Sequence, residues 1–431
     1  MTENPSNAKQ RGILVLASLL IAGLLSFFSI RNARAIHFAG LQTPEGLERA
    51  TRLEPDDDRN WHLLGRYWQF NLEQPDARRA IHAYVTSLSL NPRSANVWLD
   101  LASAYESEND FTSAQHAFLQ AKKAYPLSPE VSWQYGNFLL RQGELEAAFA
   151  EIRRAVEVEP GFGAEAFSRC LRAEPDVDKI LDRAIPSNAG VYLDVIREEI
   201  SDGQTEIALK VWDRLTEIHP RLRLQDVFIL VDDLITKKRI MEASHVWNQA
   251  VTFTGMANLQ GPPRSVLWDG GFESGITGGG FAWVFPQGFQ GFQISFDSQE
   301  KHSGNRSLRL TFDGRRNVFS SSICHYVPVE PSTAYRFSAW ERTRALETDQ
   351  GIRFQLRSLG GHDDSTNVTP DVHGSEPWTK IEIPWTSGND VQELQVCLLR
   401  YPSSQEGHRI RGTVWIDDVA LVPESTEQSK P

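Results

Sequence analysis

The chain has 431 residues, of which 40% are hydrophobic and 23% are charged. At roughly 100–200 residues per domain, this length favours two or three domains, and the apolar content excludes a largely disordered chain. The formal net charge of −12 argues against nucleic-acid binding, because phosphates attract a basic surface. Three cysteines, none of them in a Cys-x-x-Cys pair, exclude a disulfide-rich scaffold and a zinc site of the usual spacing.

A polar tail at residues 1–11 precedes an uncharged apolar run at residues 12–30. A helix of this length spans roughly 28 Å, which is close to the hydrocarbon thickness of a bilayer. We therefore expect a retained single-pass anchor in the inner (cell) membrane. The tail would be cytoplasmic, and the bulk of the chain would lie on the periplasmic or extracytoplasmic side. The small-x-small pattern Ala33-Arg34-Ala35 leaves a cleavable signal peptide open as the alternative.

The next segment, residues 41–252, carries apolar residues at helical spacing and repeats a motif. Proline recurs at Pro92, Pro126 and Pro160, at intervals of 34 residues. The unit that ends at Pro126 contains Trp98, Leu101, Ala102, Tyr105, Ala114, Phe118 and Ala121. This pattern resembles the tetratricopeptide repeat, and the resemblance predicts three clear and two degenerate helix pairs stacked into an α-helical solenoid.

The resemblance also implies that the concave groove of such a solenoid binds a peptide or a protein segment. The side chains predicted to face the groove are Arg66, Asn96, Trp133 and Asn137. Trp133 stands one position later than the aromatic residue of the pattern. Either the helix register shifts there or a tryptophan faces the groove.

Helical periodicity ends in a predicted linker at residues 253–264, which contains a Gly-Pro-Pro sequence. Period-two alternation then appears at residues 307–312, 335–340, 352–357, 379–383, 394–398 and 414–416. Short strands of this kind predict an antiparallel β-sandwich or jelly roll over residues 265–424, followed by a disordered tail at residues 425–431. The fold class is thus multidomain α plus β: a transmembrane helix, a solenoid and a jelly roll.

Three motifs in the β-rich region carry a second resemblance. They are Asp269-Gly270-Gly271-Phe272-Glu273, His302-Ser303-Gly304-Asn305-Arg306-Ser307-Leu308 and Trp415-Ile416-Asp417-Asp418-Val419. Together they resemble carbohydrate-binding modules with the galactose-binding-like jelly roll. The resemblance implies a structural Ca²⁺ ion that links the first and last strands, because calcium binds carboxylate and carbonyl oxygens. Its predicted ligands are Glu273, His302, Gly304, Asp417 and Asp418.

Strand alternation gives a set of candidate residues for sugar binding. If Tyr335, Phe337 and Ala339 point into the core, their neighbours point outward. We expect an outward face that binds a glycan, especially an acidic one, through aromatic and planar polar groups. Its predicted members are Trp340, Arg336, Arg353, Gln355, Arg357 and Trp415, and the loop residue Trp283 is predicted to line its rim.

The sequence lacks the His-Glu-x-x-His, phosphate-loop and Gly-x-Ser-x-Gly motifs, and we expect no enzymatic activity. We expect a membrane-anchored envelope scaffold that binds protein through its repeats and polysaccharide through its jelly roll, in the assembly or export of a surface or extracellular polysaccharide. Two alternatives stay open: a purely protein-binding scaffold with a structural jelly roll, and an accessory to a polysaccharide-active enzyme. Pairing of Cys324 with Cys397 also stays open at this point.

Overall fold

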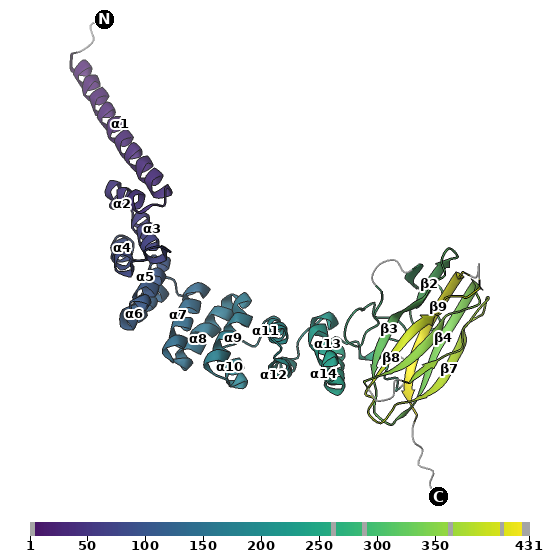
Figure 1. Ribbon diagram of the computed structural model, residues 1–431. Coiled ribbons are helices and arrows are strands. Elements are labelled where there is room, and N and C mark those ends of the chain that lie inside the picture. The colour runs from purple at the N-terminus through teal and green to yellow at the C-terminus, as the bar shows by residue number, and fades with distance from the viewer. Residues whose placement is uncertain (1–4, 260–263, 287–290, 361–364, 406–408, 425–431) are drawn as a thin grey trace. The chain divides into compact units, whose positions relative to one another are not determined.

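The computed structural model describes residues 5–259, 264–286, 291–360, 365–405 and 409–424. The predicted tail at residues 425–431 and the Gly-Pro-Pro sequence lie outside these ranges. The contacts of the chain divide it into two compact units, Met1–Pro186 and Ser187–Pro431 (Figure 1). This division falls inside the helical region and not at residues 253–264.

The first unit is built of helices that pack as consecutive pairs. Their bounds are α1 (Pro5–Gly40), α2 (Pro44–Leu53), α3 (Asp58–Phe70), α4 (Ala77–Leu90), α5 (Ala95–Ser107), α6 (Phe111–Ala124), α7 (Pro129–Gln142), α8 (Leu145–Val158), η1 (Pro160–Phe162), α9 (Gly163–Ala173) and α10 (Val177–Arg183). The pairs α3/α4, α5/α6 and α7/α8 correspond to the three clear repeats. The shorter pair α9/α10 occupies the stretch in which the 34-residue spacing is lost.

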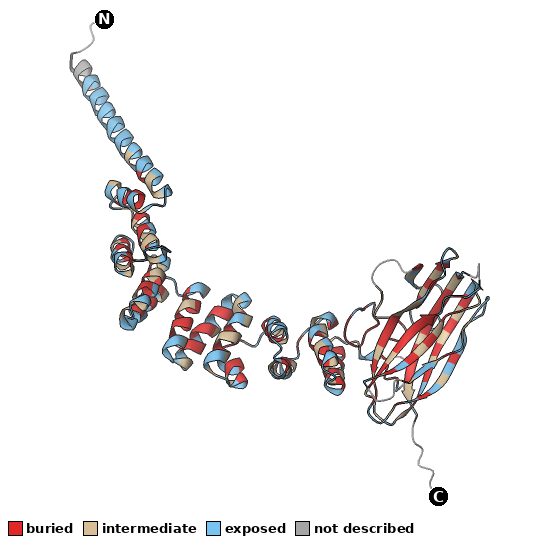
Figure 2. Ribbon diagram, in the orientation of Figure 1, coloured by how far each residue is buried: buried red, intermediate tan, exposed pale blue. Residues whose placement is uncertain are grey.

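Small residues allow the two helices of a repeat to approach closely. A Cβ atom on Gly65 of α3 would lie 2.4 Å from the Tyr84 ring of α4. A Cβ atom on Gly136 of α7 would lie 2.8 Å from Ile152 of α8. Buried residues alternate with exposed ones along the repeat helices, as the red bands of Figure 2 show.

Helix α1 continues past the apolar run into the folded unit. Its segment Arg11–Gly40 is the one described helix that is long and apolar enough to cross a membrane, and an 18-residue window within it has a mean hydropathy of 2.6. Beyond that run, Ala35 is only 1% exposed and Ala39 packs against a cluster that includes Leu47 of α2. The Arg31 guanidinium donates to Glu54 through two hydrogen bonds of 2.9 and 2.8 Å. The last turns of α1 thus form a helix pair with α2.

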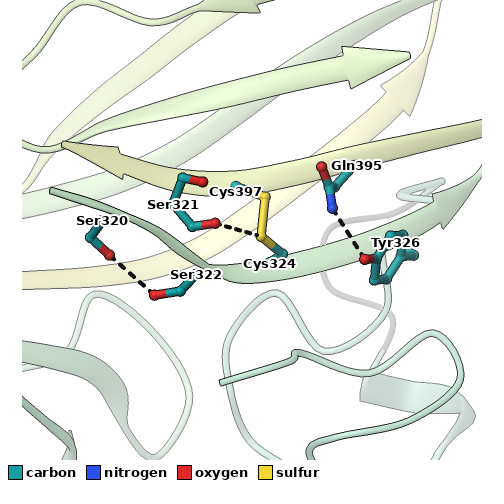
Figure 3. The surroundings of a disulfide bond; sticks show 7 residues. All are labelled: Ser320, Ser321, Ser322, Cys324, Tyr326, Gln395 and Cys397. Carbon is teal, nitrogen blue, oxygen red and sulfur yellow. Dashed lines mark hydrogen bonds between the residues drawn. A yellow bond between two sulfur atoms is a disulfide. The ribbon is translucent and has the colours of Figure 1, made fainter. Parts of the chain in front are cut away.

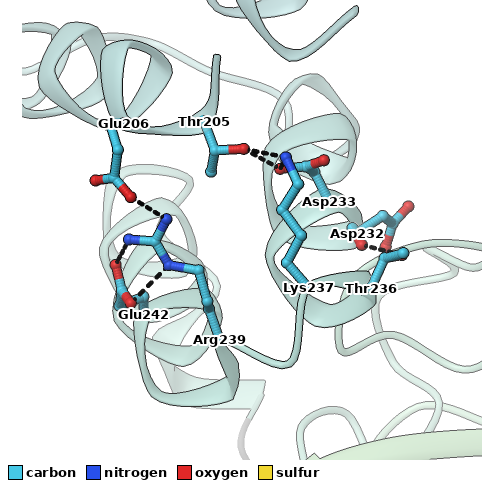
Figure 4. A network of polar contacts seen from close by, with 8 residues as sticks. All are labelled: Thr205, Glu206, Asp232, Asp233, Thr236, Lys237, Arg239 and Glu242. Carbon is cyan, nitrogen blue, oxygen red and sulfur yellow. Dashed lines mark hydrogen bonds and ion pairs between the residues drawn. The ribbon is translucent and has the colours of Figure 1, made fainter. Parts of the chain in front are cut away.

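The second unit begins with further helices. Their bounds are α11 (Ala189–Ser201), α12 (Thr205–Glu217), η2 (Leu224–Val227), α13 (Phe228–Thr236), α14 (Ile240–Phe253) and η3 (Ala257–Leu259). Polar contacts join them, as Figure 4 shows: Thr205 of α12 donates to Asp233 of α13 at 2.7 Å, and Arg239 bonds Glu206 at 2.5 Å. The two degenerate repeats are therefore helix pairs as predicted, with charged groups linking α12 to the α13/α14 pair.

A β-sandwich follows. Its strands are β1 (Phe292–Asp297), β2 (Ser307–Asp313), β3 (Ser320–Pro328), β4 (Ala334–Glu347), β5 (Arg353–Leu359), β6 (Thr366–Val368), β7 (Thr379–Thr386), β8 (Glu393–Arg400) and β9 (Arg411–Pro423). One sheet has the order β1-β2-β9-β4-β7 and the other β3-β8-β5-β6, with every pairing antiparallel. The predicted period-two segments lie in these strands, except that Ile352 precedes β5 and forms an isolated bridge with Val372. The helical repeats followed by an antiparallel sandwich confirm the predicted order of α and β regions.

The α13/α14 pair packs on the sandwich through a glycine-rich loop. A Cβ atom on Gly279 would lie 2.2 Å from the Phe228 ring, and one on Gly280 would lie 2.5 Å from the Trp247 ring. The Gly280 N–H also donates to Asp232 at 2.6 Å. A larger residue at either position would displace one of these aromatic rings. The glycines therefore permit close contact between the last repeat and the β-sandwich.

A disulfide joins Cys324 of β3 to Cys397 of β8 (Figure 3). The two residues are direct cross-strand neighbours in the four-stranded sheet. Beside them, Gln395 donates a hydrogen bond of 3.1 Å to the Tyr326 hydroxyl. The pairing that the sequence left open is therefore present.

Candidate functional site

The outer face of the five-stranded sheet contains a groove of about 750 Å³. Strand β4 supplies its floor, because Tyr335, Phe337 and Ala339 are buried in the core and the alternate residues point outward. The groove is lined by Asn258, Leu259, Gly271, Glu273, Ser303, Gly304, Arg336, Ser338, Trp340, Lys380, Asp418, Ala420, Val422, Pro423 and Glu424. The predicted orientation of Arg336 and Trp340 agrees with this structure.

Trp340 provides the aromatic surface of the groove. The His302 ring stacks on it with the ring centroids 3.8 Å apart and an interplanar angle of 16°. Trp378 meets the same histidine edge-on at 5.8 Å. Trp340 is half-buried, so the stack holds the indole in place while part of its surface still lines the groove.

The cations of the groove are neutralised by carboxylates. Arg336 forms ion pairs with Glu382, at 2.9 Å, and with Glu424. Lys380 donates to the same Glu382 at 2.8 Å. The hydrogen bond from Lys380, followed by that from Arg336, lowers the pKa of the Glu382 carboxyl below its usual value. A groove in which the cations are paired in this way suits uncharged sugar rings better than the acidic glycan expected from the sequence.

Three residues predicted for the same glycan face lie on the other sheet. Arg353, Gln355 and Arg357 belong to β5, which pairs with β8 and β6 and not with β4. Their alternation with buried Phe354 and Leu356 is as predicted. Period-two alternation shows which residues of a strand share a side but not which sheet contains the strand. The predicted set is therefore split between the two outer faces of the sandwich.

Two predicted glycan-binding tryptophans are buried, each only 1% exposed. The Trp283 indole donates to the Asp269 carbonyl at 3.1 Å and packs on Phe272 inside the core. Trp415 lies on the outer side of β9, but the guanidinium groups of Arg309 and Arg344 cover its ring at 5.6 and 4.9 Å from the centroid. Both tryptophans support the fold, and neither offers a ring face to a ligand in this structure.

The residues predicted as calcium ligands do gather around one loop. Asp417 accepts hydrogen bonds from the backbone N–H groups of His302 and Ser303, at 2.8 and 3.1 Å. Asp418 contacts the His302 ring at 2.6 Å, and Glu273 accepts from the Asn305 N–H at 2.6 Å.

Burial raises the pKa of Asp417 to about 6. A Cβ atom on Gly304 would lie 2.1 Å from the Glu273 carboxylate, so the loop and this side chain are in close contact. Within the described ranges, no group of three or more His, Cys, Asp or Glu side chains is placed to hold a metal ion. The carboxylates act here as acceptors for the loop N–H groups, and calcium stays a prediction.

The predicted groove residues of the repeats have different surroundings. Arg66 pairs with Asp100 of the next repeat at 3.2 Å, and Asn96 is exposed. Trp133 is 8% exposed and stacks on Phe162, with the ring centroids 4.9 Å apart. Asn137 is 6% exposed and accepts a hydrogen bond of 3.0 Å from Arg169 of α9. Trp133 and Asn137 thus join α7 to the following helices, and Arg66 and Asn96 are the two that remain on the surface.

Sequence reasoning missed several groove residues. Lys380, which lines the groove, and its ion-pair partner Glu382 alternate with Ile381 and Ile383 in the predicted strand at residues 379–383, so their outward direction could be predicted. Their position beside β4 was not, because it depends on the pairing of β4 with β7. Asn258 and Leu259 come from η3, which no local pattern connects to the sheet.

Comparison with known proteins bears on the repeats most directly. Residues 72–114 and 99–161 match the family model of the tetratricopeptide repeat, which confirms the predicted repeats in this part of the chain. A mouse (Mus musculus) protein, BBSome complex member BBS4, is 26% identical over 107 residues, which make up 25% of this chain. The chain spans 20% of the length of that relative.

Solved structures resemble parts of the chain. MamA matches 40% of this chain and 85% of its own, at 15% identity and a TM-score of 0.27. YrrB, described as a TPR protein with an unusual peptide-binding site, matches 49% of this chain and 94% of its own, at 14% identity and a TM-score of 0.26. A family 16 carbohydrate-binding module matches 36% of this chain and 99% of its own, at 16% identity and a TM-score of 0.26.

Proposed function

We propose that this protein is a membrane-anchored scaffold of the cell envelope and not an enzyme. Its tetratricopeptide repeats bind a protein segment, and its β-sandwich binds a polysaccharide that is being assembled or exported. The observation that carries the glycan part is the groove over β4, where Trp340 offers an aromatic surface among polar side chains. Aromatic floors with a few oriented polar groups are typical of small-molecule and sugar sites.

Two features support an exported location. The disulfide Cys324–Cys397 is of a kind that forms and persists in oxidising compartments. Helix α1 supplies a segment of suitable length and hydropathy for an anchor. The alternative of a cleaved signal peptide is disfavoured because Ala35, at the end of the cleavage pattern, is buried within the helix that packs on α2.

A second candidate function is a purely protein-binding scaffold whose β-sandwich stabilises the end of the repeats. The packing of α13/α14 on the glycine-rich loop favours it, since Trp247 contacts both Trp268 and Phe281. This candidate requires that the outer face over β4 be covered by protein. Arg336 is exposed and Trp340 lines an open groove within this unit, which favours the glycan function.

The test is affinity electrophoresis of the full-length chain in detergent micelles. The gels contain a neutral polysaccharide, xylan or hydroxyethyl cellulose, or the acidic polygalacturonate. Trp340→Ala is expected to weaken retention by a neutral polysaccharide about tenfold, because an aromatic side chain at the centre of a binding site commonly contributes that much. Trp340→Phe keeps a ring and should retain part of the binding.

Tyr401→Ala is the matched control. Tyr401 is an exposed aromatic residue that lies under Arg353 of the four-stranded sheet, away from the groove. Retention that falls with Tyr401→Ala and not with Trp340→Ala would place binding on the other face. Absence of retention by every polysaccharide, from variants that keep the wild-type circular dichroism spectrum, would refute the glycan function.

A further inference from the structure

A row of arginines continues the outer face of β4 beyond the groove. Outward residues alternate along this strand as Arg336, Ser338, Trp340, Arg342 and Arg344. At about 3.4 Å per residue, Arg342 and Arg344 lie roughly 7 and 14 Å along the strand from Trp340. Arg309 of β2 completes the row, because Arg309 and Arg342 are the cross-strand neighbours of Trp415 on its two sides.

Arg309, Arg342 and Arg344, which we call the arginine row, have fewer carboxylate partners than positive charges. Glu300 pairs with Arg342 at 3.2 Å and with Arg344 at 2.6 Å. Asp297 pairs with Arg309 at 3.4 Å and also accepts a hydrogen bond from the Trp415 indole at 3.0 Å. Three guanidinium groups thus face two carboxylates, whereas Arg336 and Lys380 of the groove meet Glu382 and Glu424.

The row is also held in position and accessible. Arg309 and Arg344 lie over the Trp415 ring, which is itself buried and fixed by its bond to Asp297. The side chains of Arg344, Arg309 and Arg342 are 57%, 41% and 33% exposed. Guanidinium groups that are positioned in advance bind carboxylate, sulfate and phosphate oxygens through paired N–H donors.

We propose that the arginine row binds the anionic substituent of a polysaccharide whose uncharged ring occupies the groove at Trp340. The substituent is a carboxylate or a sulfate-like group on the same glycan chain. This inference rests on the proposed function and narrows it to glycans that carry both neutral and acidic units. It also moves the acidic specificity expected from the sequence away from Arg353 and Arg357 to residues of the five-stranded sheet.

The experiment uses the full-length chain in detergent micelles, with polygalacturonate, dextran sulfate and neutral hydroxyethyl cellulose as probes in affinity electrophoresis. The double variant Arg342→Gln/Arg344→Gln is expected to lose about tenfold in affinity for the carboxylated or the sulfated probe. Its retention by hydroxyethyl cellulose should stay within about twofold of wild type. Higher salt should weaken retention of the wild-type protein by the acidic probes and leave its retention by hydroxyethyl cellulose unchanged.

Two further variants keep the result interpretable. Arg342→Lys/Arg344→Lys keeps the charge but loses the paired N–H donors, so its affinity for the acidic probe should fall between those of the wild type and the double glutamine variant. Arg357→Gln removes an exposed arginine from the four-stranded sheet and should change nothing. The carboxylate and sulfate arms show which anion the row prefers.

The inference is overturned if the double glutamine variant binds the acidic probes like wild type, or if Arg357→Gln has the same effect. In either case, loss of neutral binding in Trp340→Ala would leave the proposed function intact. If Trp340→Ala has no effect and no probe is retained, the proposed function fails together with this inference.

Discussion

Glu341 brings a carboxyl group into the core of the sandwich. It is the cross-strand neighbour of the buried Ile416, it is 1% exposed, and neither of its side-chain oxygens has a hydrogen-bond partner among the described residues. Burial, with a smaller contribution from the charge of Asp371, raises the pKa of this carboxyl from 4.5 to about 8. The side chain is therefore protonated in the folded protein at neutral pH, while it is ionised in the unfolded chain.

This difference predicts a pH dependence of stability. Because the folded state holds the proton more tightly, the contribution of Glu341 is fully present below pH 4.5 and is lost as the pH rises toward about 8. Between pH 4.5 and about 8, ionisation of Glu341 should lower the free energy of unfolding by up to about 4 kcal/mol. Glu341→Gln cannot ionise and should therefore not show this decrease. Thermal unfolding followed by tryptophan fluorescence at pH 5 and pH 8 measures it. Glu347→Gln, an exposed position on the same strand, should leave the pH profile unchanged.

At the scale of elements, α1 serves as an apolar helix and as the first partner of α2. A Cβ atom on Gly46 of α2 would lie 2.6 Å from the Phe38 carbonyl, which shows how closely the two helices approach. The Arg49 guanidinium of α2 lies over the Phe38 ring, with its carbon atom 5.5 Å from the centroid. The apolar run is therefore continuous with a helix whose last turns pack on α2.

This packing makes Ala35 sensitive to size. Ala35→Leu should destabilise the α1/α2 pair by about 1–3 kcal/mol, because added methyl groups overpack a filled interface. Ala33→Leu changes an exposed position two residues earlier and should alter stability by less than about 0.5 kcal/mol. Limited proteolysis of the chain in micelles, with cleavage after residue 40 as the readout, measures the difference. Equal cleavage of the two variants would contradict the described packing.

At the scale of the whole molecule, the last repeat belongs with the β-sandwich. Trp247 of α14 contacts Trp268 and Phe281, with ring centroids 5.2 and 6.0 Å apart, and Lys238 lies 3.9 Å from the buried Glu393. The unit that begins at Ser187 contains all of these contacts. A cut at residue 265 would expose the aromatic side chains that α13 and α14 cover.

We therefore predict that a fragment of residues 187–431 resists protease, while a fragment of residues 265–431 is degraded or aggregates. Gly279→Ala in the longer fragment should destabilise it by about 1–3 kcal/mol through the clash with Phe228. Gly271→Ala is the matched control, because its φ lies outside the left-handed region and its added Cβ atom would come no closer than 3.6 Å to a residue beyond its chain neighbours. Equal resistance of both fragments would show that the sandwich folds without the helix pair.

Much of the fold was predictable because its signals are local. The 34-residue spacing of prolines, with small residues at helix contacts such as Gly65 and Gly136, predicts repeated helix pairs. Period-two alternation predicts the strands and the outward direction of Trp340 and Arg336. Side chains return to the same face every 3.6 residues along a helix and every 2 residues along a strand. These periods can be recognised within a single segment.

Other features required the tertiary structure, because they depend on residues far apart in the chain. Arg353 lies on a different sheet from Trp340 because β5 pairs with β8 while β4 pairs with β9. The disulfide and the covering of Trp415 by Arg309 and Arg344 follow from the same long-range pairings. The sequence alone thus determined which segments are helices or strands and which side of each strand is apolar. The pairing of distant strands decided which polar residues share a surface, since backbone hydrogen bonds between strands leave no trace in local periodicity.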